Sequence, residues 1–134
     1  MGGREMLFPK AREIADLYEQ GQTPEPEELQ GEYYVKVPWF PWLSLEALKH
    51  RKDVEPGGDG DNVIGGGFRF GSFTLCKEDD ALLIDYDNQD NPQVMRRVID
   101  RIRRVPDGRL IGKLNYRLFG DQFFILYFEM QPVE

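Results

Sequence analysis

The last quarter of the chain, residues 107–130, contains the pattern that most constrains the fold. Two strand-like runs flank Gly120-Asp121, a dipeptide suited to a tight hairpin turn. If these two residues form the loop, pairing across it creates one wholly apolar face, which consists of Leu114, Tyr116, Leu118, Phe123, Ile125 and Tyr127. The other face is mixed, with Lys113, Asn115 and Arg117 beside Phe124, Leu126, Phe128 and Met130. We therefore expect the apolar face to be core.

The rest of the sequence predicts further strands and two main helices. Alternating apolar residues predict strands over 31–37, 67–76 and 82–86. Helical spacing predicts an N-terminal helix over 10–20 and a second helix over 92–104, with a short one over 45–49. Residues 53–62, rich in Gly and Asp, are expected to form a loop. Because sequential strands usually pair, the prediction is a mainly β (α+β) fold, in which an antiparallel meander forms a small barrel or a strongly bent sheet.

Length and charge limit the organisation and the partners. The chain has 134 residues, so we expect a single domain over 1–134. The formal net charge of −7 argues against nucleic acid as a partner, because binding to the phosphate backbone rests on cationic residues. A basic cluster between Arg96 and Arg104 is interpreted as a solvated helix face.

The cysteine count and the hydropathy indicate an intracellular location. Cys76 is the only cysteine, so no intrachain disulfide can form and a reducing compartment is favoured. No apolar run has the length of a signal peptide core or a membrane span, so we expect a cytoplasmic protein without membrane insertion. His50 is the only histidine, which excludes a multi-histidine metal site, and no motif calls for a cofactor.

Few residues point to catalysis. Asp85 and Asp87 flank Tyr86 on a predicted strand, so both carboxylates would face the same side and could form an acid–base pair. The alternative is a solvated strand end. His50 follows Lys49 and precedes another basic pair, and we expect it at the surface or at the rim of a site. No residue is assigned a catalytic role.

Charged groups on aromatic-rich strands favour a binding pocket. Arg69 lies between Phe68 and Phe70, and Arg117 follows Tyr116. If the sheet closes, an apolar interior with one or two cationic groups would suit an amphipathic ligand such as a fatty acid. The alternative is that these polar residues face solvent. The segment around Trp39 and Trp42 is a candidate portal, plug or dimer contact.

The start of the first strand resembles that of the calycin group of lipocalin-like barrels. Leu29-Gln30-Gly31-Glu32-Tyr33-Tyr34 is similar to the Leu-x-Gly-x-Trp opening of that group, with Tyr33 at the Trp position. The resemblance implies a pocket for a small hydrophobic or amphipathic molecule. The candidate ligand contacts are Tyr33, Trp39, Trp42, Phe68, Arg69, Phe70, Tyr116, Arg117 and Phe128.

Two other functions remain open at this point. One is a small isomerase or dehydratase on a bent sheet, with Asp85 in its pocket. The other is a homodimeric interaction protein without a ligand, which would associate through the mixed hairpin face or the Trp39–Trp42 segment.

Overall fold

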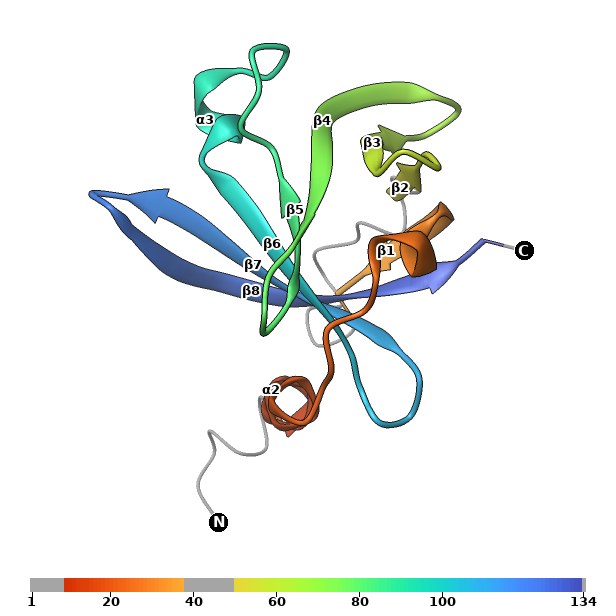
Figure 1. Ribbon diagram of the computed structural model, residues 1–134, viewed down its shortest axis with the longest axis vertical. Helices are drawn as coiled ribbons and strands as arrows, with labels where there is room; N and C mark the ends of the chain where they lie inside the picture. Colours follow the sequence, from red (N-terminus) through yellow and green to blue (C-terminus); the bar gives the residue numbers. More distant parts are fainter. Residues whose placement is uncertain (1–8, 38–49, 134) are drawn as a thin grey trace.

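Eight strands form a closed antiparallel barrel in the computed structural model, which describes residues 9–37 and 50–133 (Figure 1). Two helices and a 3₁₀ turn accompany them. The elements in chain order are α2 (Pro9–Glu19), η1 (Pro26–Leu29), β1 (Gly31–Lys36), β2 (Arg51–Val54), β3 (Asp59–Ile64), β4 (Phe68–Lys77), β5 (Leu82–Asp85), α3 (Gln93–Arg96), β6 (Val98–Arg104), β7 (Leu110–Leu118) and β8 (Asp121–Pro132). Trp39, Trp42 and the helix predicted over 45–49 lie outside the described residues.

The strands are arranged as an up-and-down meander. Each strand pairs with the next one in sequence, and β1 pairs with β8, for example at Val35 and Met130, which closes the sheet. Closure removes the exposed strand edges that an open sheet would carry. The predicted mainly β meander with an N-terminal helix is confirmed, and the sheet is a barrel.

The loop predicted over 53–62 is wrong, because β2 and β3 form a hairpin there. Gly58, with φ of 93°, lies in the tight turn that joins them. Asp53 pairs with Asp61, and Lys52 pairs with Asn62. These strands contain polar residues at positions where a strand pattern needs apolar ones, so sequence periodicity could not detect them.

The second predicted helix is present only as a single turn, α3, and the remainder of 92–104 is the strand β6. Val98, Ile99 and Ile102 satisfy helical spacing, but Asp100 and Ile102 also alternate with Arg101 and Arg103 as a strand does. β6 pairs with β5 on one side and β7 on the other. Hydrogen bonding to these two neighbours completes the barrel, and it overrides a local pattern that fits either structure.

The terminal hairpin is real, but its turn lies one residue earlier than predicted. Leu118 pairs with Asp121, so the two-residue loop is Phe119-Gly120, in which both residues have positive φ, 52° and 82°. This geometry matches the right-handed twist of the strands. A bulge between Leu114 and Asn115 shifts the register again further along. The predicted cross-strand pairs are therefore wrong.

The predicted apolar face of the hairpin is consequently not a single core face. Phe123 and Ile125 are about half exposed, at 48% and 52%, and Phe119 at the turn is 95% exposed. Tyr127 is buried, but in a cluster outside the barrel, under α2. In Figure 1 the turn end of β7 and β8 extends beyond the other strands. The displaced turn shifts the pairs by two residues and keeps the faces, but the bulge at Ile125 places Leu126 opposite Leu114 and Tyr127 opposite Lys113, which explains the error.

The barrel interior is packed with side chains from η1 and from most of the described strands. Leu29 from η1 is fully buried among them, with Leu82, Ile84 and Ile102. Gly112 permits this packing, because a Cβ there would lie 2.2 Å from the Phe128 ring. The interior is therefore a filled core over much of its length, as in other small barrels.

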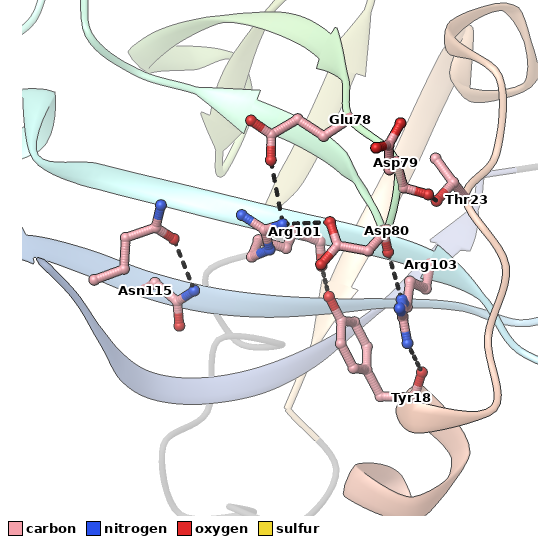
Figure 2. A network of polar contacts seen from close by, with 9 residues as sticks. Tyr18, Thr23, Glu78, Asp79, Asp80, Arg101, Arg103 and Asn115 are labelled. Atoms are coloured by element: carbon pink, nitrogen blue, oxygen red, sulfur yellow. Dashed lines mark hydrogen bonds and ion pairs between the residues drawn. The ribbon is translucent and has the colours of Figure 1, made fainter.

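The helix α2 packs on the outside of the barrel and is held by β6. The Tyr18 hydroxyl donates a hydrogen bond of 3.2 Å to the Arg101 carbonyl. Figure 2 shows Arg103 between Tyr18 and Asp80, donating to both backbone carbonyls. Arg101 pairs with Glu78 and Asp80. The basic cluster, which was interpreted as a helix face, therefore lies partly on the outer face of the strand β6. There Arg103 holds α2 against the barrel.

Candidate functional site

A cavity of about 240 Å³ lies in the barrel interior near α3. Most of its wall is apolar, and five polar side chains from different elements gather in it. The described residues that line it are Val35, Val37, His50, Lys52, Asn62, Phe70, Tyr86, Met95, Val98, Asp100, Leu114, Leu126 and Phe128.

Lys52 and Asp100 form an ion pair across the interior. In the closed strand order three strands separate β2 from β6 on either side, so the two residues approach from opposite walls. The long Lys52 side chain spans the gap and places Nζ 3.4 Å from Asp100 Oδ2. Lys52 is 3% exposed and Asp100 is 1% exposed. A buried ion pair of this kind costs much desolvation, so it needs further hydrogen bonds to be tolerated.

Tyr86 and Asn62 supply those hydrogen bonds. Lys52 Nζ donates to Asn62 Oδ1 at 2.8 Å and to the Tyr86 hydroxyl. The Tyr86 hydroxyl donates to Asp100 Oδ2 at 3.2 Å and accepts from Asn62 Nδ2 at 3.0 Å. The second Asn62 amide proton goes to the Gly71 carbonyl at 3.2 Å. Gly71, with φ of 66°, is the extra residue at a β-bulge opposite Asn62, and the bulge brings this carbonyl within reach.

His50 lies at the rim of the cavity, and the sequence predicted either this position or the surface. Its Nε2 is 2.9 Å from Asn62 Oδ1, and its ring lies 5.5 Å from the Phe70 ring, centre to centre. Burial, and then the nearby Lys52 charge, lower the pKa of His50 to about 4. The ring is therefore neutral at pH 7. Because Asn62 Oδ1 only accepts, Nε2 carries the ring proton and Nδ1 is an acceptor.

Burial dominates the electrostatics of the cluster. It lowers the pKa of Lys52 and raises the pKa of Asp100, while the attraction between the two charges opposes both shifts. It also raises the pKa of Tyr86 well above its usual value, so the phenol keeps its proton. The Lys52 ammonium lies 5.2 Å from the Tyr86 ring centre and 5.6 Å from that of Phe128, where the ring faces favour a cation.

One polar atom of the cluster has no partner in the described structure. Asp100 Oδ1 is buried and accepts no hydrogen bond, although Oδ2 accepts one from Tyr86 and forms the ion pair with Lys52. A buried carboxylate oxygen left alone costs on the order of 1–3 kcal/mol or more. Asp100 is one of the residues that line the cavity, so its carboxylate lies at the cavity wall.

The residues predicted from the sequence to contact a ligand are dispersed. Phe70 and Phe128 line the cavity. Tyr33 is buried in the barrel core outside the cavity wall, and its hydroxyl donates to the Glu28 carbonyl at 3.2 Å. Tyr116 is half-buried and is not part of the described cavity wall.

The two predicted cationic anchors face outward. Arg69 is exposed and pairs with Asp61 on the adjacent strand β3 and with Asp53 on β2. Arg117 pairs with Asp85 at 3.3 Å. Phe68 is 67% exposed. These three residues are absent from the described cavity wall, and Trp39 and Trp42 lie outside the described residues.

The isomerase or dehydratase hypothesis required Asp85 in a pocket, and the structure does not place it there. The Asp85 side chain is about one third exposed and occupied by Arg117, while Asp87 pairs with Arg96 at 2.9 Å. Neither belongs to the cavity wall as described. The paired carboxylates are part of the outer surface.

Sequence reasoning missed the central residues of the site, Lys52, Asn62 and Asp100. Asn62 and Asp100 lie on segments interpreted as a loop and a helix, and Lys52 lies just before that loop, where no element was predicted. A signal was present in β6, where Val98, Asp100 and Ile102 occupy alternate positions and only Asp100 is polar. A lone polar residue within an inward-facing apolar series is a candidate functional residue.

Two other features of the described residues do not form a competing site. A second hollow of about 530 Å³ near the β6–β7 turn contains Arg104 and Arg109, which already pair with Glu28 and Glu129. No group of three or more His, Cys, Asp and Glu residues within 9–37 and 50–133 could hold a metal ion.

Comparisons with known proteins add no family assignment. Neither a protein-family model, nor a curated protein, nor a solved structure matches the chain. Among the described helices, none is long and apolar enough to cross a membrane.

Proposed function

We propose that this protein binds a small, largely apolar molecule inside the barrel, in the manner of lipocalin-like proteins. The observation that supports this is the apolar cavity with a buried polar cluster on its wall, in which Asp100 Oδ1 lacks a partner. Binding sites for small molecules commonly combine an apolar lining with a few convergent polar groups. The meander order and the β1–β8 closure are also those of up-and-down barrels.

The cavity volume limits the size of the ligand. At about 240 Å³ it is larger than an engineered cavity of about 150 Å³ that accepts benzene, and smaller than the roughly 300–1,000 Å³ typical of drug-sized ligands. We therefore expect a ligand of roughly ten non-hydrogen atoms, such as a substituted ring or a short branched chain. A long-chain fatty acid, the example drawn from the sequence, is too large for this volume.

Toluene is a suitable first probe, because it tests the apolar cavity without any polar interaction. Titration is followed by the NMR shifts of the methyl groups of Val98, Leu114 and Leu126, which line the cavity. We expect saturable shifts confined to these methyls, with half-saturation below about 1 mM. Shifts that do not saturate, or that map to the surface near Arg109, would refute the proposal.

A matched pair of substitutions, one in β6 and one in α3, tests the location of binding. Val98→Phe adds a ring to the cavity wall and should abolish toluene binding. Val94→Phe makes the same change at a site that is 67% exposed, and binding should persist. Equal loss in both variants, with both folded, would place the binding elsewhere.

A further inference from the structure

The hydrogen bonds of the buried cluster specify what kind of polar group a ligand can bring. Lys52 has three ammonium protons, and three acceptors surround its Nζ: Asn62 Oδ1, the Tyr86 hydroxyl and Asp100 Oδ2. No Lys52 proton remains for a ligand. The cation buried in the cavity wall is therefore not available as an anchor for a carboxylate.

The other donors of the cluster are used as well. Asn62 directs its two amide protons to the Gly71 carbonyl and the Tyr86 hydroxyl. Tyr86 gives its proton to Asp100 Oδ2. His50 gives its Nε2 proton to Asn62 Oδ1, which thereby receives its second hydrogen bond. The described cluster has no donor left over.

The unused capacity consists of acceptors. Asp100 Oδ1 has no partner within the described structure, and the neutral His50 ring presents Nδ1 as a second acceptor. Asp100 Oδ1 has almost no accessible surface, so the carboxylate must turn toward the cavity before a donor there can reach this oxygen. An incoming hydroxyl would complete the hydrogen bonding of this carboxylate.

Charge selects among possible donors. The Lys52 ammonium and the Asp100 carboxylate already neutralise each other at 3.4 Å. A carboxylate ligand would add an uncompensated negative charge beside Asp100, and an ammonium ligand would compete with Lys52 for the same counter-ion. Burying either unpaired charge is costly. A neutral donor avoids both penalties.

We infer that the ligand carries a neutral hydrogen-bond donor, of the alcohol or phenol class, which it directs to Asp100 Oδ1. This inference rests on the proposed function and specifies its ligand. A neutral donor replaces the carboxylate head group expected from the sequence. Arg69 and Arg117, the cations expected to bind that carboxylate, lie outside the barrel, and Lys52 inside it already has its partners.

Four compounds that share one ring test the inference. Toluene, benzyl alcohol, benzoate and benzylamine differ only in the polar group, and their affinities are measured by calorimetry or methyl NMR at pH 7. Benzyl alcohol should bind about tenfold or more tightly than toluene, because its hydroxyl meets a buried charged acceptor. Benzoate and benzylamine should bind at least about tenfold more weakly than benzyl alcohol.

The Asp100→Asn variant provides a second test. Its amide can turn a donor toward the cavity, and the loss of the carboxylate leaves the Lys52 charge without a counter-ion. The preference should then invert, with benzoate binding more tightly than benzyl alcohol. Asp61→Asn removes a carboxylate that pairs with Arg69 on the outer surface and should leave the order unchanged. A purely structural role for Asp100 would weaken all four compounds without inverting their order.

The outcomes separate this inference from the proposed function. If toluene binds and benzoate matches or exceeds benzyl alcohol in the native protein, the inference is wrong and the cavity remains a binding site. Equal affinities for toluene and benzyl alcohol also overturn it, because Asp100 Oδ1 would then be satisfied by a trapped water. Failure of all four compounds to bind overturns the proposed function itself. The native series needs no variant, so it is decisive even if Asp100→Asn does not fold.

Discussion

Replacing Lys52 or Asp100 alone should destabilise the protein far more than replacing both. Each residue is almost completely buried, and the two charges lie 3.4 Å apart. Removing one leaves the other charge without a counter-ion in the core. Lys52→Met with Asp100→Leu removes both charges and keeps the volume apolar, so the double variant should lie within about 1–2 kcal/mol of the native protein, in either direction.

The penalty for each single variant has a ceiling, because an orphaned group can neutralise itself. In Lys52→Met, Asp100 can take a proton at pH 7, about 3 units above its ordinary pKa of 3.8, which costs about 4 kcal/mol. In Asp100→Leu, Lys52 can lose its proton about 3.5 units below its ordinary pKa of 10.5, which costs about 5 kcal/mol. These values are large fractions of the 5–15 kcal/mol typical of a domain.

The two penalties should respond to pH in opposite directions. In Lys52→Met the folded state raises the pKa of Asp100, so the variant approaches the native stability as pH falls, and at pH 5 the ceiling is about 2 kcal/mol. In Asp100→Leu the folded state lowers the pKa of Lys52, so stability recovers as pH rises, and at pH 9 the ceiling is also about 2 kcal/mol.

Urea unfolding followed by circular dichroism measures these free energies, with the native protein at each pH as reference. Arg69→Met and Asp61→Leu remove a pair that is 3.1 Å apart but largely exposed, and each should cost less than about 1 kcal/mol. The Lys52–Asp100 ion pair would be refuted if Lys52→Met and Asp100→Leu each lowered the free energy of unfolding no more than these controls. It would also be refuted if the two losses were additive in the double variant.

Three further predictions follow from local geometry. The folded state lowers the pKa of His50 from 6.5 to about 4, so His50 contributes stability above pH 6.5 that is lost as pH falls through 4. The loss in the free energy of unfolding is about 3 kcal/mol. In urea unfolding across this pH range, a His50→Gln variant should not show this loss. Gly112→Ala places a Cβ 2.2 Å from the Phe128 ring and should destabilise the barrel by about 1–3 kcal/mol, whereas Gly57→Ala, with no atom within 4 Å, should change the thermal midpoint little. Phe119→Asn should raise the free energy of unfolding by roughly 0.5–1 kcal/mol, because Asn tolerates the positive φ of 52° better than Phe; a drop in stability would contradict this assignment of the turn.

Local patterns were sufficient for the elements that one stretch of sequence controls. The N-terminal helix spans Pro9–Glu19, within one residue of the predicted 10–20, and Tyr33 and Val35 share the buried face of β1. Leu82, Ile84 and Tyr86 are all buried on the predicted side of the β5 segment. In each case apolar periodicity matches the face that becomes buried, so a single strand or helix carries its own signal.

Local sequence patterns were enough to predict a mainly β meander with an N-terminal helix, because alternation and turn residues act over a few positions. The closure of the sheet, and the burial of Lys52, Asn62 and Asp100 inside it, depend on contacts between distant strands. These polar residues are tolerated in the interior only as partners of one another, and the partners come from strands that are distant in the sequence. The same closure turned Arg69 and Arg117 outward, toward carboxylates on β3 and β5. The location of the candidate site is therefore a property of the barrel, since no single strand contains enough of it to be recognised.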